Sequence, residues 1–206
     1  MKHTENINVV EVLPIISPKE LKELIPASVE SLNTVKKARK EIKKILDRKD
    51  RRLLAIVGPC SIHDKKAAIE YAKRLKELSD SVSEKILIVM RVYFEKPRTT
   101  VGWKGLINDP EIDGSHKINE GIELARRILL EINNLGVPCA TETLDPVTPQ
   151  YLADLISWSA IGARTTESQT HRELASGLSM PVGFKNATNG ELSIALNAMK
   201  SSLQSH

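Results

Sequence analysis

Five short apolar runs, each followed by a stretch with helical spacing, constrain the fold of this sequence more than any other feature. The runs lie at residues 53–57, 86–90, 137–140, 158–163 and 181–184. Apolar runs of this length are typical of strands buried on both faces. Strands that alternate with helices indicate a parallel sheet covered by helices. We therefore expect an α/β fold with five βα units.

The helical stretches carry their own boundary signals. Asp64 is a candidate N-cap, and we expect Tyr71 and Leu78 of the helix that follows to face inward. A long loop is expected from about residue 93 to 117, and Gly136 fits just past the end of the next helix. The last helix carries an apolar stripe made of Leu192, Ala195, Leu196, Met199 and Leu203.

Residues 1–50 are expected to form an N-terminal extension with a regulatory or oligomerisation role, separate from a barrel domain at residues 51–206. Ser17 and Glu20 have the spacing of a capping box, and the short helix that they begin should stop at Pro26. A longer helix should follow, with an apolar stripe of Val35, Ala38, Ile42, Ile45 and Leu46.

The choice between an open sheet and a closed barrel depends on motif and length. An open nucleotide-binding sheet would show a Gly-rich turn after its first strand, and this sequence has none. A (β/α)8 TIM barrel needs eight units and roughly 250 residues. With 206 residues and five units, the chain is expected to be an incomplete barrel or the N-terminal fragment of one.

Composition narrows the function classes. The chain is 41% hydrophobic and 27% charged, as in ordinary globular proteins, and no segment approaches the ~20 apolar residues of a membrane span. The net charge is +4, but aromatic residues make up only 3%, which argues against a nucleic-acid surface. Two distant cysteines do not indicate a disulfide scaffold, so we expect a reducing cytoplasm.

Cations gather just after the predicted strands, where barrel enzymes keep their reactive groups. They are Arg91, Lys96, Arg98, Arg164 and Lys185. These charges would repel one another unless an anion lay between them, and guanidinium and ammonium groups suit phosphate and carboxylate. Thr99 and Thr100 add hydroxyl donors. The nearby acids Glu142, Asp145 and Glu167 can pair with one or two cations but not with all five.

Cys60 follows the first strand and allows three interpretations: an inert buried thiol, a nucleophile with His63 as its base, or a metal ligand. The spacing alone does not choose between nucleophile and ligand. Cys139 lies inside a predicted strand and is expected in the core. His63 and His171 are expected to be structural polar groups.

Four segments resemble the class I 3-deoxy-D-arabino-heptulosonate 7-phosphate (DAHP) synthases. They are GPCSIHD at 58–64, RVYFEKPRTTVGWKG at 91–105, GARTTESQ at 162–169 and PVGFKN at 181–186. The resemblance covers nearly the whole chain. It implies a metal-dependent condensation of phosphoenolpyruvate with erythrose 4-phosphate and water, the first step of the shikimate pathway of aromatic amino acid biosynthesis.

The resemblance also implies a role for each matching residue. Cys60 would be a ligand of the catalytic divalent metal, such as Mn²⁺, Fe²⁺ or Zn²⁺, and Glu142 would lie near phosphoenolpyruvate and orient a water or an arginine. Phosphoenolpyruvate would be held by Arg91, Lys96, Arg164, Lys185 and the Ala163 backbone, with Lys96 also able to reach the aldehyde. Erythrose 4-phosphate would lie against Pro97, Arg98 and Thr99.

The sequence departs from the family pattern because the other metal ligands, a His, a Glu and an Asp, belong to later strands that it lacks. We therefore expect the isolated chain to be inactive and to bind metal weakly. The family is often inhibited by an aromatic amino acid, and Pro146, Ser179 and Met180 fall in the region of that site, closer in type to the tyrosine-sensitive form. A homo-oligomer is also expected.

Two other functions remain open from the sequence. The chain could be a non-catalytic domain that binds a phosphate ligand or a protein partner. It could also belong to a barrel aldolase that uses a Schiff-base lysine, with Lys185 as the candidate, because such a lysine needs burial or a cationic neighbour to lower its pKa.

Overall fold

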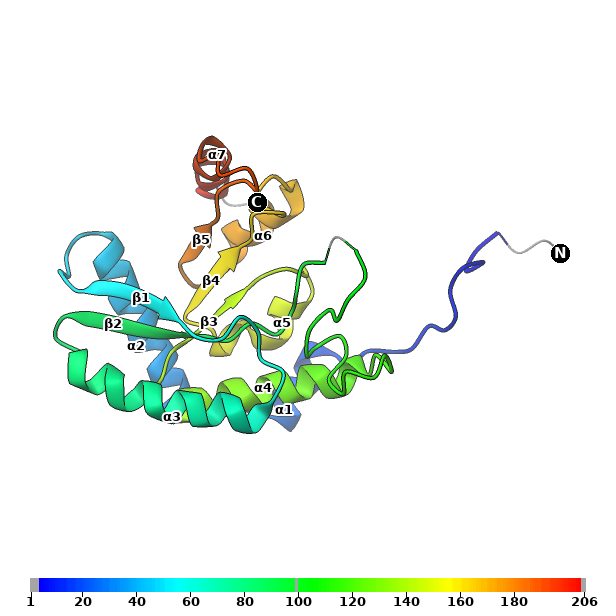
Figure 1. The fold of residues 1–206 in the computed structure, drawn as a ribbon, viewed down its shortest axis with the longest axis horizontal. Helices are drawn as coiled ribbons and strands as arrows, with labels where there is room; N and C mark the ends of the chain where they lie inside the picture. The colour runs from blue at the N-terminus through cyan, green and yellow to red at the C-terminus, as the bar shows by residue number, and fades with distance from the viewer. Residues whose placement is uncertain (1–3, 99, 205–206) are drawn as a thin grey trace.

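Five parallel strands form a half-barrel in the computed structural model, which describes residues 4–98 and 100–204 (Figure 1). The strands pair in chain order and are β1 (Leu53–Val57), β2 (Ile86–Arg91), β3 (Cys139–Glu142), β4 (Trp158–Ile161) and β5 (Val182–Phe184). The predicted α/β class and the incomplete barrel of five units are confirmed. The predicted third strand begins two residues too early, because β3 starts at Cys139 and includes Glu142.

Helices separate the strands as predicted. They are α1 (Pro18–Leu24), α2 (Val29–Leu46), α3 (Lys65–Val82), α4 (Ile118–Asn134), α5 (Thr148–Leu152) with the 3-10 turn η1 (Ala153–Leu155), α6 (Gln169–Gly177) and α7 (Ser193–Ser202). Both predicted caps are present, since Ser17 and Glu20 form a capping box and the Asp64 side chain accepts a hydrogen bond from the Ala67 amide. None of the helices in the described residues is both long enough and apolar enough to cross a membrane.

The core lies on both faces of β2. Ile88 and Met90 pack in the larger cluster with α3 and α4, whereas Leu87 and Val89 pack in a second cluster with Ile42 of α2. Alternate side chains of a strand point to opposite faces, so this division follows from the pleat. The prediction that this strand is buried on both faces is confirmed.

The same prediction is wrong for β1. Leu53 is 69% exposed and Val57 is also exposed. Among the described residues β1 pairs only with β2, and it therefore lies at an edge of the sheet. An edge strand can carry the same run of apolar residues as a buried strand. The apolar run in the sequence therefore did not distinguish the two.

Several apolar side chains expected on inward stripes are exposed. Tyr71 and Leu78 of α3 point outward, while Ala72 and Leu75 face the sheet. On α7 the one buried member of the stripe is Ala195, and this helix packs mainly on α6 and β5. The exposed large members of the predicted stripes of α2 and the last helix are Leu46, Leu192, Leu196, Met199 and Leu203.

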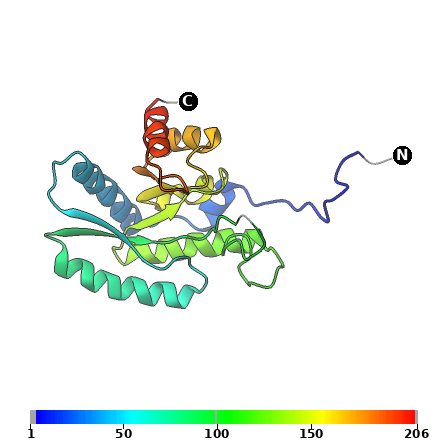
Figure 2. The ribbon, with the colours of Figure 1, turned by 45° about the horizontal axis from the view of Figure 1, so that its top comes forward.

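The segment that begins at residue 4 and leads to α1 runs away from the body of the molecule, as both views show (Figures 1 and 2). It joins the fold at Pro14 and Ile16. The Asn119 side chain donates to the Pro14 carbonyl and accepts from the Ile16 amide, and the Tyr151 hydroxyl donates to the Ile16 carbonyl. Neither the structure nor its contacts assign a separate role to residues 1–50, so that division stays a prediction.

Arg126 connects its own helix, α4, to three other elements from inside the core. Its side chain is 1% exposed and donates to the carbonyl of Ile25 at 2.7 Å and to that of Tyr151 at 2.9 Å. Nη1, which also donates to Tyr151, and Nη2 donate to the two carboxylate oxygens of Asp154, at 2.8 and 2.9 Å. One buried guanidinium therefore joins the end of α1 to α4, α5 and η1.

We predict that Arg126→Met lowers the free energy of unfolding by about 3 kcal/mol, because it leaves a carboxylate and two carbonyls without a partner. Urea denaturation followed by circular dichroism measures this. Arg127→Met is the matched control on the same helix, since Arg127 pairs with Glu123 in solvent and should contribute at most about 0.5 kcal/mol. Equal losses in the two variants would contradict the assignment.

Candidate functional site

The carboxyl ends of the five strands lie along one edge of the sheet because all neighbouring pairs are parallel. Each strand delivers one polar group to this edge, at its last residue or shortly after it. In chain order these residues are Cys60, Arg91, Glu142, Arg164 and Lys185. The convergence predicted from the sequence is therefore present in the fold.

Cys60 is exposed and lies against Lys96. The lysine Nζ is 3.0 Å from the cysteine Sγ and 3.3 Å from its carbonyl oxygen, which also accepts from Arg91 at 3.3 Å. The Lys96 hydrogen bond lowers the pKa of the Cys60 thiol, and the charges of Lys96, Arg91 and Arg98 act in the same direction. Among the described residues the partner of this thiol is Lys96 rather than the predicted base His63.

Tyr93 lies against cations from the ends of two strands, β2 and β5. The Arg91 guanidinium lies 3.7 Å above the centre of the tyrosine ring, and the Lys185 Nζ lies 5.7 Å from it. Lys185 also pairs with Glu142 at 3.4 Å. The electron-rich ring attracts both cations, and this attraction offsets part of their mutual repulsion. Tyr93 was not among the predicted site residues, and its only signal in the sequence is an aromatic side chain just after a strand.

Glu142 is 7% exposed and is confined by Gly162. A Cβ atom at Gly162 would overlap with the Glu142 carboxylate, so the glycine leaves the space that this side chain occupies. The Thr166 hydroxyl lies 2.8 Å from the Gly162 carbonyl and 3.0 Å from that of Lys185. The acid is thus held beside Lys185, and the prediction that acids neutralise one or two of the cations is confirmed for this pair.

A depression beside these groups carries the remaining cations, and we call it the cationic mouth. It is lined by Glu95, Lys96, Pro97, Arg98, Lys104, Asn108, Leu144, Asp145 and Arg164. Arg164 is exposed and has no ion pair among the described residues, and Ala163 before it is half-buried. Lys104, Asn108 and Glu95 were not predicted. Thr99 lies outside the described residues.

Arg98 is oriented by the loop that follows it. Its Nε donates to the Trp103 carbonyl at 3.0 Å, and the Trp103 indole donates to the Asp109 carbonyl at 2.7 Å. The two terminal nitrogens of Arg98 have no protein partner among the described residues. They are therefore available to an anion in the mouth.

The described residues do not form a complete metal site. Nowhere in residues 4–98 and 100–204 do three or more His, Cys, Asp or Glu side chains come close enough to hold a metal ion. Cys60 offers one sulfur donor, and its neighbours Lys96 and Arg91 are cations. Protein sites for transition metals use several donors, so this set does not fit a bound ion by itself.

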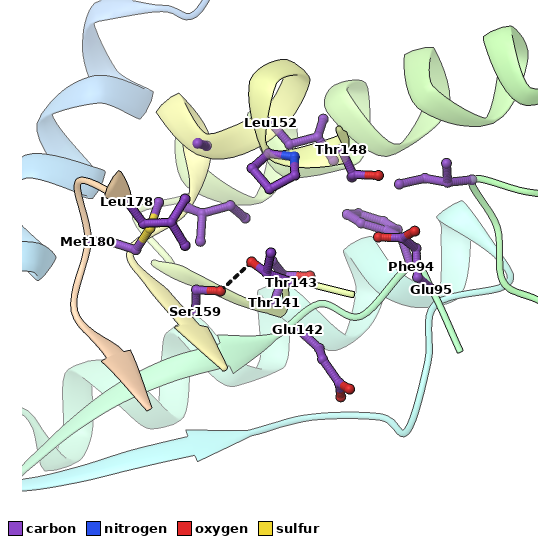
Figure 3. Close-up of a pocket in the computed structure, with 14 residues that line it drawn as sticks. Phe94, Glu95, Thr141, Glu142, Thr143, Thr148, Leu152, Ser159, Leu178 and Met180 are labelled. Carbon is purple, nitrogen blue, oxygen red and sulfur yellow. Dashed lines mark hydrogen bonds between the residues drawn. The ribbon is translucent and has the colours of Figure 1, made fainter. Parts of the chain in front are cut away.

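An apolar pocket lies behind the mouth, between the sheet and α5 (Figure 3). Leu152, Leu178 and Met180 form its apolar wall, and the hydroxyls of Thr143 and Ser159 are 2.6 Å apart on the opposite side. Of the three residues predicted for an inhibitor site, Met180 lines this pocket. Ser179 is exposed beside Met180, and Pro146 lies on an exposed loop outside the lining.

The remaining predictions for single residues concern packing. Cys139 is buried, and burial raises the pKa of its thiol, so its assignment to the core is confirmed. The two ring nitrogens of His171 are 2.9 Å from the Ser168 hydroxyl and 2.7 Å from the Leu144 carbonyl, which confirms a structural role. His63 is exposed.

Known proteins resemble this chain closely. Residues 25–206 match the model of the DAHP synthetase I family. The Tyr-sensitive phospho-2-dehydro-3-deoxyheptonate aldolase of Escherichia coli K12 is 57% identical over 98% of the chain, and the Phe-sensitive one is also 57% identical over 98%. A solved phospho-2-dehydro-3-deoxyheptonate aldolase from Francisella tularensis is 57% identical over 94% of the chain, with a TM-score of 0.92. The chain spans 56 to 58% of the length of these relatives.

We predict that Lys96→Met slows alkylation of Cys60 by iodoacetamide severalfold near neutral pH, because removing the lysine raises the thiol pKa and lowers the thiolate fraction. Mass spectrometry of the modified peptide gives the rate. Lys104→Met removes a cation that lines the mouth without contacting the sulfur, and it should leave the rate nearly unchanged. Cys139 serves as an internal control for folding, since its buried thiol should not react. An unchanged rate in Lys96→Met would refute the contact.

Proposed function

Because the chain belongs to the DAHP synthetase I family, we propose that the whole protein condenses phosphoenolpyruvate with erythrose 4-phosphate and water. The products are 3-deoxy-D-arabino-heptulosonate 7-phosphate and inorganic phosphate, in the first step of the shikimate pathway. The cationic mouth at the strand ends carries this proposal, because both substrates are phosphorylated and one is also a carboxylate. We expect the protein to act in the cytoplasm.

The phosphoenolpyruvate site is formed by the cations nearest to Tyr93 and by two groups of the mouth. Arg91 and Lys185 share the tyrosine ring, so their charges are already held together before a ligand arrives. Fixed cations of this kind stabilise charge without reorganisation during the reaction. The proposed set is Arg91, Lys96, Ala163 through its backbone, Arg164 and Lys185.

The erythrose 4-phosphate site is assigned to Pro97, Arg98 and Thr99. This assignment is supported by the two terminal nitrogens of Arg98, which have no protein partner among the described residues. A guanidinium can bind a phosphate through two parallel hydrogen bonds. Lys96 precedes Pro97 in the chain, and its Nζ contacts Cys60. We propose that it contacts the sugar aldehyde as well as phosphoenolpyruvate.

Cys60 is proposed as one ligand of a divalent metal such as Mn²⁺, Fe²⁺ or Zn²⁺, with the other ligands supplied outside this chain. A metal of this kind acts as a Lewis acid on a carbonyl oxygen. The lowered pKa of the thiol favours the thiolate form that metals bind. Glu142 is proposed to orient a water or an arginine at the phosphoenolpyruvate end.

Regulation by an aromatic amino acid is proposed from relatives whose names describe Tyr-, Phe- and Trp-sensitive forms. Pro146, Ser179 and Met180 are the proposed contacts, with residues 1–50 as the regulatory or oligomerisation segment of a homo-oligomer. The apolar pocket beside Met180 supports this location for the inhibitor site, because an aromatic side chain is bound by burying its ring against apolar groups.

A second candidate is a non-catalytic domain that binds a phosphorylated ligand. The observation that favours it for the isolated chain is a cationic mouth without any group of three or more metal-binding side chains in the described residues. Anion binding without turnover is then all that the described residues can support.

We expect the 206-residue chain to release no phosphate from the two substrates with added Mn²⁺, because its metal site has one donor. A coupled assay for inorganic phosphate tests this, with a complete relative such as the Escherichia coli enzyme as the positive control. Clear turnover by the chain would overturn the proposal that its ligand set is incomplete.

We expect tyrosine to inhibit the whole protein at lower concentrations than phenylalanine or tryptophan. Initial rates of phosphate release, measured while each amino acid is titrated separately, give the three midpoints. Inhibition by phenylalanine alone would count against the tyrosine-sensitive assignment.

A further inference from the structure

Glu95 is a carboxyl group buried at the wall of the cationic mouth. It is 7% exposed, precedes Lys96 in the chain and lines the same depression as Arg98 and Arg164. Despite these cations it makes no ion pair among the described residues. Its side chain also borders the apolar pocket, where Figure 3 shows it next to Phe94.

The immediate neighbours of Glu95 are acids rather than bases. Its carboxyl hydrogen-bonds to Thr148 and faces Asp145 and Glu142. Glu142 is occupied by Lys185, and Asp145 accepts hydrogen bonds from the backbone at the start of α5. Burial, followed by the charge of Asp145, raises the pKa of Glu95 to about 7, against the opposing effect of the Thr148 hydrogen bond.

The titratable and charged groups that share a cavity wall with Glu95 come from five segments. They are Lys96, Arg98, Lys104, Glu142, Asp145, Tyr151 and Arg164. A carboxylate in this position would compete with a substrate anion for the cations of the mouth. A neutral carboxyl group would leave them free.

We propose that Glu95 takes up a proton from solvent when an anion binds in the cationic mouth. The step converts the Glu95 carboxylate to a carboxylic acid and breaks no other bond. Glu95 is then a positioning residue that acts through Lys96, Arg98 and Arg164, because its neutral form keeps their charges directed at the ligand. This inference rests on the proposed function only in requiring that the mouth binds anions.

Anion binding and protonation of Glu95 should favour each other. An anion raises the pKa of a carboxyl group beside it, so binding takes up protons between the pKa of the free state and that of the bound state. With a free value of about 7, saturation at pH 7 should take up at most about half a proton. Anion affinity should fall as the pH rises above neutral.

Isothermal titration calorimetry of the 206-residue chain with sulfate tests this. Sulfate is the probe because it keeps both charges through neutral pH, whereas phosphate titrates there. Titrations at one pH in buffers of different ionisation enthalpy give the number of protons taken up. We expect uptake for the unmodified chain and binding without uptake for Glu95→Gln, with affinity at least as high above neutral pH.

Two further variants separate the proton linkage from a folding effect. Asp145→Asn keeps the acceptor at the start of α5 but removes the nearest acidic charge, so the uptake should move to lower pH. Glu111→Gln changes an exposed acid that pairs with Lys117, and its uptake should equal that of the unmodified chain.

Each outcome distinguishes this inference from the proposed function. Sulfate binding without proton uptake in the unmodified chain, or uptake that persists in Glu95→Gln, overturns the role of Glu95 and leaves the anion site standing. No sulfate binding at all overturns the anion site itself, and the inference with it.

Discussion

Parallel pairing of the five strands in chain order is the constraint on which the rest of this structure depends. It requires each connection to return to the same end of the sheet, which makes the helices necessary. It also places the residue after every strand at one edge, where Cys60, Arg91 and Lys185 come together from distant parts of the sequence. The order and direction of the strands therefore bring the site residues to one edge of the sheet, and individual contacts then fix their positions.

Like charges at that edge are tolerated because buried groups organise them. Tyr93 offers its ring to two cations, and Glu142 neutralises one of them from a position that only the absence of a side chain at Gly162 permits. Glu95 works in the opposite way, since a buried acid among acids is more stable when it is neutral. The mouth thus keeps a surplus of positive charge that matches anionic ligands.

The spacing of apolar residues in the sequence predicted the strands and helices well where the apolar side of an element is covered by a neighbouring element. It succeeded for β2, whose alternating side chains enter two clusters, whereas a local motif correctly predicted the capping box at Ser17. It failed for β1 and for Tyr71, because an apolar residue has the same spacing whether a neighbour covers it or not. The cations of the site were predicted for a firmer reason, namely their position just after strands.

The sequence by itself determined the class of fold, the order of its units and the family, because these depend on local patterns and on motifs of adjacent residues. Only the tertiary structure decided which groups meet: Lys96 rather than His63 on Cys60, two cations on Tyr93, and at Glu95 an acid that has no ion pair within residues 4–98 and 100–204. The physical reason is that charge interactions act through space over a few ångströms, and residues far apart in the chain reach that distance only when the sheet has formed.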